Sequence, residues 1–190
     1  MTLNKYLKDK EKFTDEELTT VNSFFTIMSF KKKSMLLEQG NICKYLHFIV
    51  NGLVKSYFLD RNGQEVIINF ASENWWATDI NSFEECKASR MYIEAIEDTE
   101  CLVLTIENQY KLFDKIPKLE RVFRILLHKH TGALQDRLFE HIAATAEDRY
   151  DSFLDRYPSL SNRIPQYEIA AYIGVSPEFL SRIRKRRVSK

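Results

Sequence analysis

Three residues near the C-terminal end combine side chains that can read DNA bases. Glu178, Ser181 and Arg182 lie three and four positions apart, so a helix brings them to one side. An arginine can donate two hydrogen bonds to guanine O6 and N7, and a carboxylate can accept one from cytosine N4. This combination predicts contacts to base edges in the major groove.

Basic residues surround this group, although the whole chain is close to neutral. The formal net charge is +1, whereas residues 177–190 hold six basic side chains and one acidic one. A neutral body with a basic end indicates one anionic partner, and a solvated tail is the alternative. Six residues of the motif are expected to contact DNA phosphates: Gln166, Tyr167, Ser176, Arg184, Lys185 and Arg186.

Two predicted helices and the turn between them position these side chains. The first covers residues 166–173, where Ala170 is small enough for a second helix to cross closely. Gly174 allows the positive φ of a tight turn, Ser176 is a favourable N-cap, and Pro177 suits the first helical position. Together they are typical of a helix-turn-helix, whose second helix enters the major groove. A hairpin with a purely structural role is the alternative.

The first half of the chain predicts a helical start and then a set of strands. A capping box from Thr14 to Glu17 begins a helix, and helical character should extend to about residue 29. Short β-branched and aromatic runs follow to about residue 106, with Asn-Gly pairs at 51–52 and 62–63 between them. These runs predict a small antiparallel barrel or sandwich.

A long helix should link the strands to the motif. Apolar residues recur every three or four positions from Leu119 to Ile142. The stripe is wide enough for two neighbours, which predicts packing on the strand domain and on a second copy of the chain. Burial within one subunit is the alternative. A shorter helix is predicted over residues 146–156.

Composition excludes several other kinds of protein. Cys43, Cys86 and Cys101 are odd in number and form no Cys-x-x-Cys pair, which indicates a reducing compartment and no zinc site. The first residues are too polar for a signal peptide, and no run approaches the roughly 18 apolar residues of a membrane span. We therefore expect a cytoplasmic protein without membrane contact. No phosphate-binding loop or nucleophile elbow is present, so an enzyme is not predicted.

Residues 164–185 resemble the DNA-binding motif of the Crp/Fnr superfamily, the catabolite activator and fumarate–nitrate regulators. That motif reads DNA through Glu-x-x-Ser/Gly-Arg, and Glu178, Ser181 and Arg182 stand in its positions. The central serine is similar to the fumarate–nitrate branch, which implies a TTGA-like half-site. The resemblance covers nearly the whole chain and implies an α+β fold. Its three parts are an antiparallel β-roll of the cyclic-nucleotide-binding type (1–107), a dimerisation helix (108–144) and a helix-turn-helix with a reduced wing (145–190).

The resemblance also suggests where an effector would bind. Cyclic-nucleotide binders of the family carry a Gly-Glu pair for the ribose and an arginine for the cyclic phosphate. Alignment puts Ala77 and Thr78 at the pair and Ser89 at the arginine, while a one-residue offset turns Arg90 to the opposite face of a strand. Five residues form the candidate effector pocket: Trp76, Ala77, Thr78, Ser89 and Arg90. The expected effector is therefore not cAMP, and its identity is left open.

No metal or cofactor is predicted. The cysteine cluster that would hold an iron–sulfur centre is missing before the roll, and His47 is the candidate haem ligand in the strands. A lone histidine in a strand is more often a core residue.

These observations predict a transcriptional regulator that binds a pseudo-palindromic DNA site as a homodimer. A small-molecule effector and RNA polymerase are its other expected partners. The alternative is a regulatory module of the cyclic-nucleotide type whose basic terminal helix docks on an acidic protein surface.

Overall fold

The computed structural model describes residues 3–188, which form two compact units. The first unit runs to Phe58 and resumes over Ile68–Leu126, and the second comprises Leu59–Ile67 and the residues from Leu127 onward. The boundary falls inside the long helix α5 (Lys118–Ala143). The division into three functional parts at residues 107 and 144 stays a prediction.

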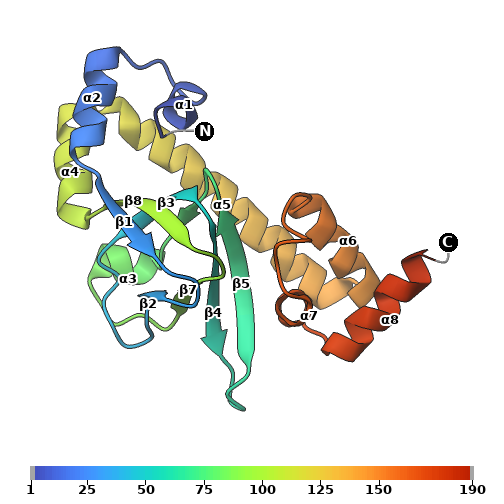
Figure 1. The fold of residues 1–190 in the computed structure, drawn as a ribbon. Helices are drawn as coiled ribbons and strands as arrows, with labels where there is room; N and C mark the ends of the chain where they lie inside the picture. The colour runs from blue at the N-terminus through green and yellow to red at the C-terminus, as the bar shows by residue number, and fades with distance from the viewer. Residues whose placement is uncertain (1–2, 189–190) are drawn as a thin grey trace. The chain divides into compact units, whose positions relative to one another are not determined.

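Two four-stranded sheets, in the orders β1-β8-β3-β6 and β2-β7-β4-β5, confirm the predicted antiparallel roll. Figure 1 shows β1, β8 and β3 side by side, and β4 beside β5. The strands are β1 (Thr26–Phe30), β2 (Met35–Leu37), β3 (Leu46–Asn51), β4 (Leu53–Leu59), β5 (Glu65–Ser72), β6 (Trp76–Ala77), β7 (Tyr92–Ala95) and β8 (Thr99–Leu104).

Gly52 makes the link from β3 to β4, and only glycine fits there. Its φ is +104°, and a Cβ atom would lie 2.5 Å from Thr99 Oγ1 and 2.7 Å from the carbonyl oxygen of Asp98. The link allows β3 to pair with β8 in one sheet and β4 with β7 in the other. Phe48 and Ile93, one from each sheet, are fully buried in the core of this unit.

Short helices accompany the sheets: α1 (Leu3–Lys8), α2 (Asp15–Ser23), α3 (Ile80–Glu85) and α4 (Ile106–Lys115). The predicted capping box opens α2, because Thr14 and Glu17 exchange hydrogen bonds of 2.7 and 3.2 Å. The expectation of helix to residue 29 is wrong: β1 begins at Thr26, since Thr26 and Ile27 favour a strand and pair with β8. Helix α4 lies at the start of the segment 108–144, which the structure divides into α4 and the longer α5.

The second unit contains α6 (Ala146–Arg156), α7 (Gln166–Ile173) and α8 (Pro177–Val188) after the last part of α5. Phe153 is fully buried, and its ring lies 5.4 Å from that of Tyr157 and 5.5 Å from that of Tyr172. The prediction of α6 is confirmed at both ends. From residue 157 to 165, all of which are described, the chain makes turns and no strand, consistent with a reduced wing.

Two kinds of feature are missing from the described residues. No helix among them has the length and apolar character needed to cross a membrane. Within residues 3–188, His, Cys, Asp and Glu side chains form no group of three that could hold a metal ion.

Candidate nucleic-acid interface and effector pocket

The turn between α7 and α8 has the geometry that its residues predict. Gly174 ends α7 with φ +73° and ψ +44°, and the N–H of Val175 donates to the carbonyl of Ala170 over 3.0 Å. Ser176 caps α8, because its hydroxyl oxygen accepts from the N–H of Phe179 over 3.2 Å. The helix-turn-helix is therefore built largely from local interactions.

Arginines hold the C-terminal end of α7 in place. Arg137 of α5 donates to the carbonyl of Tyr172 over 3.1 Å, and Arg149 of α6 donates to that of Ile173 over 2.8 Å. The last carbonyls of a helix lack partners within it and carry partial negative charge, so guanidinium groups are well suited to them. The guanidinium carbon of Arg137 also lies 4.1 Å from the centre of the Tyr172 ring, within the range of a cation–π interaction. This clamp fixes α7 within its unit.

The three base-reading candidates are all exposed on α8. Leu180 and Ile183 are buried, which turns Glu178, Ser181 and Arg182 outward. A hydrogen bond from Ser176 is the main cause that lowers the pKa of Glu178, and the charge of Arg182 adds to it. Glu178 is therefore an ionised acceptor at neutral pH, and Arg182 is a donor four residues later. The structure brings the predicted group together on one surface.

The structure places five of the six phosphate candidates at exposed positions: Gln166, Tyr167, Ser176, Arg184 and Lys185. The sixth, Arg186, is exposed too but forms an ion pair of 3.2 Å with Glu147 of α6. Arg187 pairs with Asp151 of the same helix. Exposed pairs of this kind contribute about 0–1 kcal/mol, so a phosphate could replace the carboxylate. Sequence reasoning missed these pairs, because 36–39 residues separate their members.

The five candidate effector residues lie in different surroundings. Trp76 belongs to an aromatic cluster, with its ring 4.9 Å from that of Phe48, 5.6 Å from that of Phe123 and 6.1 Å from that of Tyr6. Ala77 is buried in β6 beside His47, and Arg90 is exposed. Thr78 and Ser89 join a polar network at the start of α3.

Asp79 is the centre of that network, and sequence reasoning missed it. One carboxylate oxygen accepts from the hydroxyl of Ser89 over 2.7 Å, and the other caps α3 by accepting from the N–H of Ser82 over 3.3 Å. Asp79, Ser82 and Ser89 are all buried. An aspartate directly before a short helix is the N-cap signal that could have identified it.

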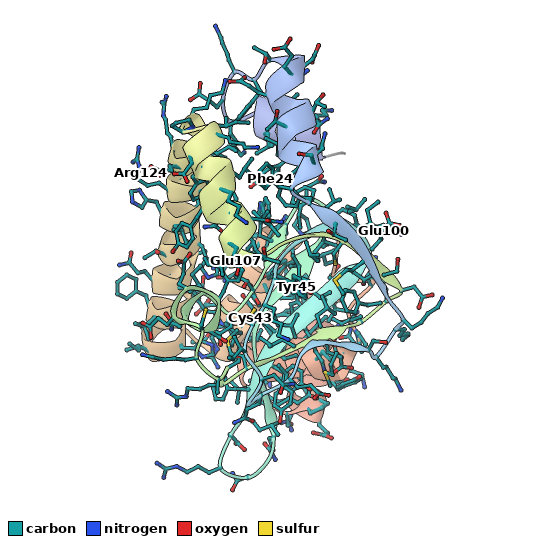
Figure 2. The ribbon with its side chains drawn as sticks, turned by 90° about the vertical axis from the view of Figure 1, so that its left-hand side faces the viewer. Phe24, Cys43, Tyr45, Glu100, Glu107 and Arg124 are labelled. Atoms are coloured by element: carbon teal, nitrogen blue, oxygen red, sulfur yellow. The ribbon has the colours of Figure 1, made fainter. Side chains whose placement is uncertain are left out.

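The hydroxyl of Thr78 is also bound within the roll. It donates to the carbonyl of Tyr45 over 3.3 Å and lies 3.3 Å from the sulfur of Cys43. Figure 2 shows Cys43 and Tyr45 close together in the segment that leads into β3. Polar groups at this end of the roll thus bind one another.

His47 has the surroundings of a core histidine. Its Nδ1 lies 3.1 Å from the carbonyl oxygen of Ala77, and Phe30 and Tyr45 flank its ring. Burial lowers the pKa of His47 to about 4. The side chain is therefore neutral at physiological pH.

Comparison with known proteins agrees with this architecture. Residues 27–115 match the family "Cyclic nucleotide-binding domain". The cAMP-activated global transcriptional regulator CRP of Salmonella typhimurium is 29% identical over 103 residues, 54% of this chain. The same protein of Klebsiella aerogenes matches to the same extent. These matches span about half the length of the relatives, 47%.

Solved structures share the fold over most of the chain. The c-di-GMP responsive regulator CLP of Xanthomonas campestris has a TM-score of 0.74, with 14% identity, over 93% of this chain and 92% of its own. FixK2 of Bradyrhizobium japonicum has a TM-score of 0.76, with 21% identity, over 87% and 85%. Residues 27–115 are thus similar to cyclic nucleotide-binding domains, and the solved structures show that the chain shares their fold.

Proposed function

We propose that this chain is a sequence-specific DNA-binding transcriptional regulator, and not an enzyme, that acts as a homodimer. The main support is the outer face of α8, where Glu178, Ser181 and Arg182 are exposed together. Hydrogen bonds from Arg137 and Arg149 stabilise the helix-turn-helix that presents them. Side chains placed in this way match the donors and acceptors of base edges. The curated relatives named above are transcriptional regulators, which supports the same role here.

The proposed contacts to DNA are of two kinds, to bases and to phosphates. Arg182 would donate to guanine and Glu178 would accept from cytosine N4, while Gln166, Arg184 and Lys185 would meet phosphates. Phosphate contacts position the protein and make its affinity fall with salt, and base contacts select the sequence.

An apolar stripe on α5 supports the homodimer. Its members are large, apolar and exposed side chains that recur every four or seven residues: Leu127, Leu134, Leu138 and Ile142. Ile142 is 75% exposed and Leu138 is 57% exposed, which is costly for residues of this size unless a partner covers them. The same stripe of a second copy is the partner we infer. Two recognition helices would then lie about 34 Å apart, one turn of DNA.

The roll is proposed as a sensor for a small molecule other than cAMP. Ser89 stands at the position of the family's phosphate-binding arginine, and its hydroxyl is bound to the carboxylate of Asp79. A phosphate placed about 4 Å from that carboxylate would be repelled by about 1–4 kcal/mol. The nature of the signal differs among relatives, since CRP is cAMP-activated and CLP is c-di-GMP responsive. RNA polymerase remains a proposed partner.

Selection from random duplexes with the full chain tests the proposal. We expect an inverted repeat whose half-sites are about one helical turn apart. Arg182→Ala should abolish this preference and leave weak, salt-sensitive binding. Lys111→Ala, which removes an exposed cation from α4, is the control and should bind as the parent does.

Two outcomes would count against the proposal. If no sequence is enriched, the basic helix docks on a protein surface instead. An unchanged sequence preference in Arg182→Ala would show that α8 is not the recognition helix.

A further inference from the structure

An aromatic side chain lies at the edge of the proposed base-reading face. Phe179 is 38% exposed on α8, directly after Glu178 and three residues before Arg182. Large apolar side chains on a short, charged helix are normally turned toward the core. Leu180 and Ile183 do this on the same helix, and Phe179 does not.

The ring of Phe179 is in contact with the guanidinium group of Arg182. The guanidinium carbon of Arg182 lies 5.2 Å from the centre of the ring, within the range of a cation–π interaction. Residues three apart on a helix are neighbours, so the contact forms within α8 and needs no other element. Arg182 thus lies against the ring of Phe179, and its charge acts on the carboxylate of Glu178, four residues before it.

We propose that Phe179 is a specificity-determining residue that contacts the 5-methyl group of a thymine, and that it also positions Arg182. The inference rests on the proposed function, because it places α8 in the major groove. There the thymine methyl is the apolar feature that distinguishes one base pair from the others, and an aromatic ring suits it. Successive bases of a strand lie about 3.4 Å apart, so a ring 5.2 Å from the guanidinium reaches the neighbouring base pair.

Replacing thymine by uracil provides a direct test, because it removes only the methyl group. Duplexes carrying the selected site would have each thymine replaced in turn, and affinity would be measured for the full chain. We expect one position per half-site, next to the guanine that Arg182 contacts, to lose about fourfold in affinity, the value of one buried methyl group. Phe179→Ala should bind the thymine and uracil duplexes equally.

A second variant separates the two roles of the ring. Phe179→Leu keeps an apolar surface but removes the cation–π contact. It should retain part of the thymine preference and tolerate changes at the guanine more than the parent does. Tyr110→Ala, which removes an exposed ring from α4, is the matched control and should leave both preferences unchanged.

The outcomes are distinct from those of the proposed function. If no sequence is selected at all, the proposed function fails. If a site is selected but no thymine-to-uracil change depends on Phe179, the proposed function stands and this inference is wrong. The inference is also overturned if Phe179→Ala lowers the affinity for thymine and uracil duplexes by the same factor, so that the preference for thymine is kept. That is the behaviour of a sugar or phosphate contact.

Discussion

The proposed DNA-binding end and the proposed sensor end of this chain differ in how their polar side chains are used. On α8, Glu178 and Arg182 are exposed and directed away from the core. At the start of α3, the carboxylate of Asp79 is buried and bound by Ser82 and Ser89. A side chain recognises an external ligand only if its hydrogen-bonding atoms can be reached from solvent. The exposed groups of α8 meet this condition, whereas the buried carboxylate of Asp79 does not.

The difference also appears in how each end is stabilised. Arg137 and Arg149 clamp the carbonyl end of α7, which leaves the outer face of α8 to its partner. In the roll, the polar network is itself part of the core, so altering it should cost stability as well as binding. Four experiments test this difference between the two ends.

The largest effect should come from the apolar stripe, on which the DNA-binding end depends. Leu134→Glu with Leu138→Glu should give a monomer, because two carboxylates cannot be buried without partners. Loss of the second half-site should lower affinity for the inverted repeat by about three orders of magnitude. Sedimentation equilibrium and gel-shift titration measure both effects. Lys129→Glu, on the opposite side of α5, is the control, and a dimeric double variant would refute the seam.

Acidification should destabilise the sensor end through His47. Its pKa is about 4 in the folded chain and about 6.5 when unfolded, so the unfolded state binds more protons between these values. Stability is therefore fully present above pH 6.5 and falls as the pH drops toward 4, by about 3 kcal/mol in all. Urea unfolding at several pH values measures the slope. His47→Gln should flatten it in this window, and an unchanged slope would exclude His47 as its origin.

Removing the carboxylate from the sensor network should cost about 2 kcal/mol of unfolding free energy. Asp79→Ala leaves the hydroxyl of Ser89 and the N-terminus of α3 without their acceptor. Thermal unfolding measures the loss, with the exposed Asp114→Ala as a control. Calorimetry with cAMP should show no binding to the parent chain. Tight binding of cAMP would remove the contrast between the two ends.

The smallest effect should come from a matched pair of glycines. Gly174 has φ +73°, so Gly174→Ala strains the turn before α8 and should destabilise the second unit by about 1 kcal/mol. Gly132 lies within α5 with nothing near its added Cβ, so Gly132→Ala should stabilise the helix by about 0.5–1 kcal/mol. Chemical denaturation distinguishes the signs. Loss of stability in Gly132→Ala would indicate that another chain approaches closely there.

The elements predicted well are those specified by neighbouring residues. The turn and the start of α8 follow from the backbone and capping preferences of Gly174, Ser176 and Pro177. The capping box at Thr14 opens α2 in the same way. The spacing of Phe24 and Phe25 continues that of α2 and predicts helix where the structure has β1. Pairing with β8, some 70 residues away, overrides that pattern.

Neighbouring residues specify the local features of this protein, namely the caps, the turns and the helical spacing that gathers Glu178, Ser181 and Arg182. Which polar groups bind one another inside the protein depends on how the chain folds. Asp79 meets Ser89, and Arg186 meets Glu147, because the chain folds back on itself. Hydrogen bonds and ion pairs act over a few ångströms regardless of sequence separation. Local preferences therefore reveal where such groups lie, and folding determines which of them remain available to a ligand.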